Sequence, residues 1–240
     1  MKNSKFFLAP CLLTMILALP GCAGRNNSGI PPSDKESPQV MSTVPPVLLS
    51  YETSEIPEGT DIDALASSVF KLEVYDSKGF KTATGTGFVY GDPKVLATSA
   101  HVIVNMDYME VTRDNGETFK ITAKASYADK DKDIALFKLP SDVDLPALKL
   151  KEDIPPRGTP VFTIGSQAGL TNLLTTGVVS GTWNDKGTDY LLFTAPVSGG
   201  NSGGPVFDCD GNVVAVVTGT YEKAQNLNIG LIAKELPETE

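Results

Sequence analysis

Short apolar runs separated by turn residues make up most of the chain after residue 68. The runs are rich in valine, isoleucine, threonine and aromatic residues, which favour strands, while Gly, Asp and Asn gather between them. The predicted strands are 69–75, 84–90, 94–98, 109–113, 117–127, 134–139, 161–164, 175–183, 189–195, 205–207, 213–220 and 227–233. So many short strands with little helix predict an all-β fold, either a sandwich or a pair of barrels.

One short helix is expected before the strands, in the stretch "DIDALASSVF" (residues 61–70). Thr60 and Asp63 have the spacing of a capping box, in which two side chains bond to each other's backbone amides at the start of a helix. We expect this helix to open a folded domain that spans residues 61–240.

The first 21 residues have the pattern of an export signal. Two lysines precede the apolar stretch "FFLAPCLLTMILALP", which is short and interrupted by proline, unlike a membrane-spanning helix. It runs into "LPGC" (residues 19–22), which resembles the bacterial lipobox and so implies cleavage before Cys22 and lipidation of that cysteine. Several acyl chains would hold the protein on a membrane. The alternative is ordinary secretion with cleavage after Ala23.

Residues 22–60 differ in composition from the rest, being rich in Pro, Ser, Gly and acids with few apolar residues to bury. Such a segment predicts a disordered tether between the lipidated Cys22 and the folded domain. The expected location is the bacterial cell envelope, on the extracytoplasmic side of a membrane. A net charge of −9 argues against nucleic acid as a partner, because phosphate binding needs a basic face.

The three cysteines offer no disulfide to the folded domain. Cys11 lies in the leader and Cys22 is the lipidation candidate, so Cys209 has no partner. Cys209 lies in a turn between two apolar runs with no histidine near it in the sequence, which favours a structural thiol over a catalytic one.

The stretch "SGGNSGGPVFD" (residues 198–208) is either a flexible linker or a reaction centre. A serine hydroxyl needs a base that takes its proton as it attacks, and His101 is the only histidine in the chain. A lone histidine is more often structural than catalytic. The strand pattern that follows "SGGNSGG" at once, however, is not typical of a linker.

A catalytic histidine also needs a partner on its second nitrogen, and the stretch "ADKDKDIALFKL" (residues 128–139) supplies three candidates. Asp129, Asp131 and Asp133 could all be solvated loop charges. Asp133 directly precedes a buried strand pattern, where a carboxylate can be drawn inward, and is favoured over the other two.

Five stretches occur in the order expected of trypsin-like serine proteases: "TGTGFVY", "TSAHV", "DIALFKL", "TIGSQAGLTNLLTTGVVSG" and "GNSGGPVFD". The chain resembles most closely the HtrA (Deg) branch of that family. The resemblance implies two six-stranded antiparallel β-barrels with the active site between them. No room is expected for a PDZ domain after the last predicted strand, and the oligomeric state stays open.

The resemblance also implies roles for individual residues. His101 would be the general base, Asp133 its orienting partner and Ser202 the nucleophile, in the chain order of the chymotrypsin pattern. The oxyanion hole would lie in Gly200, Asn201 and Ser202, with the backbone amides of Gly200 and Ser202 as donors. Asn201 replaces the aspartate that pairs with a newly cut N-terminus in digestive trypsins, so activation by clipping is not expected. Neither a metal ion nor a cofactor is implied.

The predicted substrate pocket is small and mostly apolar. Pro196 stands where trypsin has its specificity acid, and the other expected walls are Val217, Thr218, Gly219 and Thr220. These features predict a membrane-anchored serine endopeptidase that forms an acyl-enzyme, acts on proteins or peptides and cuts after Ala, Val, Ile or Leu, in envelope protein quality control. The alternative is a catalytically silent trypsin-fold lipoprotein that serves as a binding or scaffold module.

Overall fold

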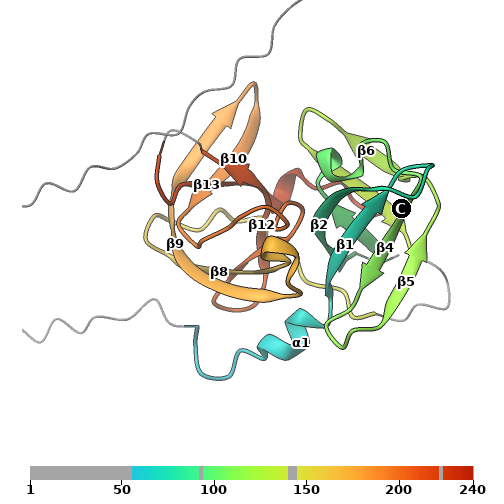
Figure 1. Cartoon of the computed structure of the whole chain (residues 1–240). Helices are drawn as coiled ribbons and strands as arrows, with labels where there is room; N and C mark the ends of the chain where they lie inside the picture. The colour runs from blue at the N-terminus through green and yellow to red at the C-terminus, as the bar shows by residue number, and fades with distance from the viewer. Residues whose placement is uncertain (1–55, 92–93, 140–144, 222–223, 240) are drawn as a thin grey trace, which may run out of the picture. The chain divides into compact units, whose positions relative to one another are not determined.

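The computed structural model describes residues 56–91, 94–139, 145–221 and 224–239. The predicted leader, the lipidation site Cys22 and nearly all of the predicted tether lie outside the described residues. None of the described helices is long and apolar enough to cross a membrane. The described part consists of two β-structures that follow one another along the chain (Figure 1).

The first β-structure is a seven-stranded antiparallel sheet with the order β5-β4-β1-β2-β3-β7-β6. Its core consists of large apolar side chains that are fully buried, among them Phe70, Leu72, Met109 and Phe137. The strands are β1 (Val69–Tyr75), β2 (Lys81–Tyr90), β3 (Val95–Thr98), β4 (Tyr108–Thr112), β5 (Thr118–Ile121), β6 (Tyr127–Asp129) and β7 (Ile134–Lys138).

The second β-structure is a closed six-stranded barrel with the order β10-β13-β12-β11-β8-β9. Its interior is filled by buried residues such as Leu191, Phe193, Val206 and Ile232. The strands are β8 (Pro160–Gly165), β9 (Leu173–Asp185), β10 (Thr188–Phe193), β11 (Pro205–Asp208), β12 (Val213–Thr220) and β13 (Asn228–Ile232).

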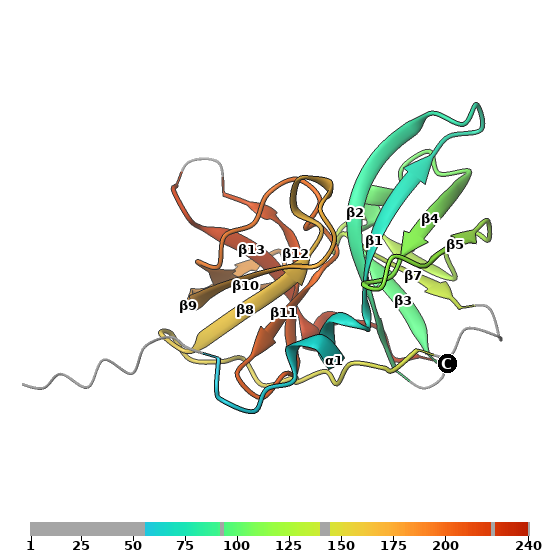
Figure 2. The same ribbon diagram turned by 60° about the horizontal axis from the view of Figure 1, so that its bottom comes forward.

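A third apolar cluster joins the sheet to the barrel. Phe88 of the sheet belongs to the same buried cluster as Phe162 and Phe207 of the barrel. The rings of Phe162 and Phe207 stack on each other with centroids 5.0 Å apart. In both views strand β2 is the part of the sheet that faces the barrel (Figures 1 and 2). The contact between the two halves is therefore built on a continuous hydrophobic core.

The predicted all-β class and one closed six-stranded barrel are confirmed. The first half is an antiparallel sheet of seven strands, with β5 and β6 at its ends among the described residues. The extra strand arises because the predicted strand 117–127 is two strands that pair with different partners. Ile121 of β5 pairs with β4, whereas Tyr127 of β6 pairs with Leu136 of β7.

The predicted first helix exists as α1 (Ile62–Ala66), but the predicted capping box is wrong by one residue. Asp61 caps the helix, its carboxylate accepting a hydrogen bond from the backbone of Ala64 at 3.0 Å. The Thr60 hydroxyl donates instead to the carbonyl of Cys209 at 3.1 Å, which fastens the start of α1 to the barrel turn.

Burial raises the pKa of the Cys209 thiol. A less acidic thiol agrees with the structural role predicted for this residue.

Candidate active site

The segments that contain His101 and Ser202 pack against each other where the sheet meets the barrel. The hydroxyl of Ser99 donates to the carbonyl of Val217 at 3.3 Å, and the amide of Gly203 donates to the same carbonyl at 2.8 Å. A Cβ atom on Gly203 would collide with Thr98 and Ser99. Glycine at this position therefore lets the residues around Ser202 lie directly against the strand end that leads to His101.

His101 is positioned by the short 3-10 helix η1 (Ala100–Ile103), which directly follows β3. Its Nδ1 lies 2.7 Å from Oδ2 of Asp133, and its backbone amide donates to Oδ1 of the same carboxylate at 2.9 Å. With Nδ1 as a donor to Asp133, the neutral ring has Nε2 free to accept a proton. Both side chains are partly exposed, at 50% for His101 and 25% for Asp133, so solvent and substrate can reach the pair.

Asp133 is held at the start of β7 by an unusual backbone conformation. Its φ of +57° lies in the left-handed region, which aspartate tolerates better than most residues. Its carbonyl accepts a hydrogen bond from the amide of Ala100 at 3.2 Å. Backbone and carboxylate of Asp133 are thus both bonded to the start of η1, which fixes the imidazole in direction as well as in position.

The other two aspartates of this stretch have different surroundings. The carboxylate of Asp129 accepts hydrogen bonds from the amides of Asp131 and Lys132, at 2.9 and 3.0 Å, and so shapes the turn before Asp133. These amide bonds are the main reason why the pKa of Asp129 is lowered. The structure therefore pairs His101 with Asp133 and uses Asp129 to form the turn.

The Asp133 carboxylate raises the pKa of His101, chiefly through the hydrogen bond to Nδ1. Partial burial of the ring acts in the opposite direction, because desolvation disfavours the imidazolium. The net effect is a raised pKa, which makes the neutral imidazole a stronger base for accepting a proton during a reaction.

The backbone around Ser202 is fixed by hydrogen bonds to four consecutive carbonyls. Every carbonyl from residue 199 to residue 202 has a donor, and only one of these donors is a side chain. The pairs are Ala168 N to Gly199 O at 2.8 Å, Thr86 Oγ1 to Gly200 O at 2.7 Å, Gly204 N to Asn201 O at 2.9 Å and Thr86 N to Ser202 O at 2.9 Å. The peptide planes of this segment therefore have little freedom to rotate.

Three backbone amides of the same segment, those of Gly199, Gly200 and Ser202, have no acceptor among the described residues, and Gly199 is exposed to solvent. The amide of Asn201 donates to Ser198 and that of Gly203 to Val217, but those of Gly200 and Ser202 donate to no described group. In a trans peptide the N–H points opposite to the preceding carbonyl. The carbonyls of Gly199 and Asn201 accept hydrogen bonds from Ala168 and Gly204, so the free amides of Gly200 and Ser202, called the two free amides below, point away from these partners.

Gly200 is required by the turn that orients the first of these amides. The turn runs from Ser198 to Asn201 and is closed by a hydrogen bond of 3.1 Å between them. Gly200 is the third residue of the turn and has a φ of +103°, a conformation that is unfavourable for other residues. A Cβ atom here would also collide with the carbonyl of Ser166.

Asn201 contributes to the segment through its backbone. Its side chain is buried, and neither of its polar atoms has a partner among the described residues. A carboxylate in the same place would bury an unpaired charge, which costs far more than a neutral amide. The neutral asparagine avoids that cost.

A cavity of about 300 Å³ lies where the substrate pocket was predicted. Pro196 and Thr220 line it as expected, whereas Thr218 and Gly219 lie outside its lining and Val217 is a fully buried part of the barrel core. The Val217 side chain therefore does not line this cavity. The lining residues that sequence reasoning missed are Val197, Tyr221, Ala224, Asn226, Leu227 and Asn228.

A second cavity of about 390 Å³ borders His101 and Asp133 on the sheet side. Its wall is mostly apolar, with Ile103 and Val104 from η1 and the residue after it, and Lys130 is the one lysine or arginine among the described residues that line it. This cavity could not be predicted from the sequence, because its wall combines η1 with the turn before β7.

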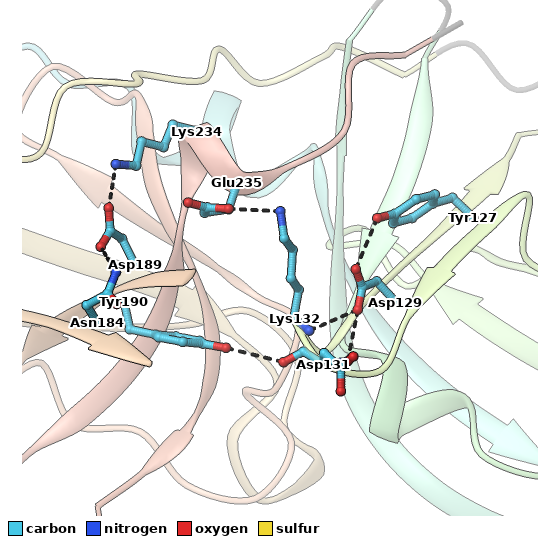
Figure 3. A network of polar contacts seen from close by, with 9 residues as sticks. All are labelled: Tyr127, Asp129, Asp131, Lys132, Asn184, Asp189, Tyr190, Lys234 and Glu235. Atoms are coloured by element: carbon cyan, nitrogen blue, oxygen red, sulfur yellow. Dashed lines mark hydrogen bonds and ion pairs between the residues drawn. The ribbon is translucent and has the colours of Figure 1, made fainter. Parts of the chain in front are cut away.

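A polar network ties the Asp133 turn to the barrel (Figure 3). Lys132 forms an ion pair with Glu235 at 2.8 Å, and the hydroxyl of Tyr190 donates to the carbonyl of Asp131 at 3.4 Å. Glu235 belongs to the 3-10 helix η3 (Ala233–Glu235), so the end of the barrel holds the turn that carries Asp133. Among the described residues, no cluster of His, Cys, Asp and Glu has the arrangement of a metal site.

The sequence is similar to those of known proteins. A family model described as "Trypsin-like peptidase domain" matches residues 85–216, more than half of the chain. Serine protease HTRA1A of Danio rerio is 34% identical over 172 residues, and serine protease HTRA4 of Homo sapiens is 30% identical over 169. Both alignments cover 65% of this chain and 35% of the relative, so the chain spans about a third of the length of these relatives.

Solved structures share the fold. The Rv3671c protease from M. tuberculosis in its active form is 25% identical, with a TM-score of 0.64, over 72% of this chain and 79% of the other. The HtrA-type protease AlgW, solved with a tripeptide, is 23% identical with the same TM-score, over 72% of this chain and 60% of the other. From the match over residues 85–216, the shared fold and the relatives, we conclude that the chain belongs to the trypsin-like peptidase domain family, with HtrA serine proteases among its relatives.

Proposed function

We propose that this chain is a serine endopeptidase in which Ser202 is the nucleophile, His101 the general base and Asp133 its orienting partner. The observation that supports this most directly is the combination of the 2.7 Å contact between His101 and Asp133 with two free backbone amides beside Ser202. Such a combination provides both a proton acceptor and two donors for a developing oxyanion.

The proposed reaction proceeds in two halves. His101 Nε2 accepts the proton of Ser202 Oγ while Oγ forms a bond to the carbonyl carbon of the substrate. The resulting oxyanion accepts hydrogen bonds from the amides of Gly200 and Ser202, each worth about 3 kcal/mol in the transition state. The imidazolium then gives its proton to the leaving amine as the C–N bond breaks. Water attacks the acyl-enzyme in the same way and releases Ser202.

We infer that the preferred substrates present a medium aliphatic side chain to the cavity beside Pro196. The described residues that line this cavity carry no charge. A lysine or arginine side chain would lose hydration there without gaining a counter-charge. An aliphatic side chain gains from burial, so Val, Ile, Ala or Leu should be preferred at the cleaved position by about ten- to two-hundredfold.

We further propose that the protein is a lipoprotein of the bacterial envelope that acts in protein quality control there. The support for the anchor is the "LPGC" stretch at Cys22 after an apolar leader, and the support for the role is the relation to HtrA proteases. Replacing Cys22 by serine should abolish membrane pelleting once the leader has been removed. Unchanged pelleting of a processed C22S protein would contradict the anchor.

The proposed activity is tested on the purified protein with a serine-reactive fluorophosphonate probe and a peptide library. The wild-type protein should be labelled on Ser202 and should cut the library after aliphatic residues. The variant S202A should lose both properties, whereas the matched variant S198A, which removes an exposed serine four residues earlier, should keep them. A wild-type protein that is neither labelled nor able to cut would favour the binding or scaffold alternative.

A further inference from the structure

Thr86 of strand β2 connects the sheet to the backbone that surrounds Ser202. It is fully buried at the junction of the two halves. Its hydroxyl donates to the carbonyl of Gly200 at 2.7 Å and accepts a hydrogen bond from the amide of Ser166 at 2.9 Å. Its own amide donates to the carbonyl of Ser202 at 2.9 Å. One residue of the sheet thus contacts the barrel segment on both sides of Asn201.

Among the four carbonyls of residues 199–202, that of Gly200 is the one held by a side chain. The carbonyls of Gly199, Asn201 and Ser202 are each held by a backbone amide, whereas that of Gly200 is held by the Thr86 hydroxyl. The peptide that contains this carbonyl lies between the two free amides. The nitrogen of this peptide is held by the hydrogen bond from the Asn201 amide to Ser198, so loss of the hydroxyl would leave only its carbonyl without a partner. Because Gly200 has no side chain to restrict it, the carbonyl could then tilt.

The surroundings make the hydroxyl difficult to replace. The side-chain carboxamide of Asn201 and the hydroxyl of Ser166 are buried and unpaired among the described residues. Without the Thr86 hydroxyl, the Gly200 carbonyl and the Ser166 amide would also lose their partner in the same place. Buried polar groups that lose their partners favour a rearrangement that satisfies them.

We propose that Thr86 is a positioning residue that holds the amides of Gly200 and Ser202 in the direction that an oxyanion needs. This inference rests on the proposed peptidase activity. Thr86 itself touches neither the substrate nor the reacting atoms. Its loss should therefore lower the rate of acylation and the affinity for tetrahedral adducts, while substrate binding in the ground state stays unchanged.

The experiment compares Thr86→Val, Thr86→Ser and the control Thr84→Val in the full chain. Thr84 lies two residues earlier on the same strand, and its hydroxyl has no hydrogen bond among the described residues. We expect T86V to lower kcat about 10- to 100-fold with KM changed less than about twofold, because removal of an oxyanion donor itself costs about 10²- to 10³-fold. The affinity for a peptide aldehyde, which forms a tetrahedral adduct with Ser202, should fall by the same factor.

The conservative variant and the pH profile separate positioning from a merely structural role. T86S keeps the hydroxyl and should restore most of kcat, T84V should behave as wild type, and the pH midpoint set by His101 should not move in any variant. If T86V does not fold, Thr86→Cys takes its place, since a thiol is only a weak donor.

Three outcomes would overturn the inference. An active wild type with unchanged kcat per folded molecule in T86V would show that the hydroxyl is only structural. A raised KM with unchanged kcat would place Thr86 in substrate binding. A wild type that neither hydrolyses peptides nor binds the aldehyde would overturn the proposed function itself, and this inference with it.

Discussion

The seven-stranded sheet and the closed barrel contribute different kinds of groups to the site. The sheet supplies side chains, namely the imidazole of His101, the carboxylate of Asp133 and the hydroxyl of Thr86. The barrel supplies the Ser202 hydroxyl together with backbone, chiefly the two free amides of Gly200 and Ser202. The chemistry proposed here therefore depends on how accurately the two halves are held against each other.

Two contacts between the halves differ in their physical character. Thr86 is fully buried and its contacts with Gly200 and Ser166 are neutral hydrogen bonds. The ion pair between Lys132 and Glu235 is partly exposed, with side-chain exposures of 32% and 16%. A buried partner that is lost leaves another group unsatisfied, whereas a partly exposed charge regains water. The buried contact should therefore control the site much more strongly than the ionic one.

The largest expected effect comes from removing either the general base His101, which the sheet supplies, or the nucleophile Ser202, which the barrel supplies. H101A and S202A should each lower kcat on the order of 10⁶-fold, and the double variant should be no slower than either single variant. The reason is that neither residue can act without the other. Peptide hydrolysis by the three variants, measured with active-site titration of the wild type, checks this. Losses that multiply in the double variant would show that the halves act independently.

The next effect concerns the pair within the sheet. D133N should lower kcat about 10⁴-fold, because the amide no longer fixes the tautomer or stabilises the imidazolium. In the wild type, the raised pKa of His101 places the rise of activity with pH above the ordinary histidine value of about 6.5, since only the neutral ring accepts a proton. In D133N the midpoint should move to lower pH.

The measurement is kcat/KM between pH 5 and 9 for both proteins, with the matched variant D131N as the control. Asp131 lies in the same turn, and its carboxylate makes no hydrogen bond among the described residues. A midpoint that is equal in wild type and D133N would contradict the assignment of Asp133 as the partner of His101.

A smaller effect is expected from disturbing the barrel's backbone. G200A places a side chain where φ is +103° and where it would collide with the carbonyl of Ser166. The loss of one oriented amide should lower kcat about 10²- to 10³-fold while His101 titrates as in the wild type. G199A is the matched control, because a Cβ atom at Gly199 meets nothing within 4 Å and its φ is not positive. Equal activity of G200A and G199A would remove Gly200 from the proposed oxyanion hole.

The contrast between side chains and backbone also explains what could be predicted from the sequence. The strand pattern and the stretches around His101, Asp133 and Ser202 are local signals, so the all-β class and the candidate residues could be proposed in advance. Thr86 could not, because its hydroxyl meets Gly200 and Ser166 only after the sheet has packed on the barrel.

The features that differ from the sequence predictions have similar causes. The division of 117–127 into β5 and β6 depends on strand pairing, which is a tertiary property. The Val217 side chain points into the barrel core because of its register in β12, and that register was not visible in the sequence. Helix α1 is capped by Asp61 and not by Thr60, because the Thr60 hydroxyl donates a hydrogen bond to the carbonyl of Cys209, which is distant in the sequence.

The smallest effect should come from the exposed ionic contact between the halves. E235Q removes the partner of Lys132 but leaves the hydrogen bond from Tyr190 to the carbonyl of Asp131, so the turn before Asp133 keeps one link to the barrel. The free energy of unfolding should fall by less than about 1 kcal/mol, as is usual for partly exposed ion pairs. Since the contact between His101 and Asp133 does not depend on Glu235, kcat should change by less than about threefold and the pH midpoint should stay in place. Urea denaturation and a pH profile of E235Q check both expectations, and the same measurements on K132A should give a similar result. A loss of activity as large as that of T86V would mean that the ionic contact positions Asp133, and the proposed difference between the buried and the exposed link would be wrong.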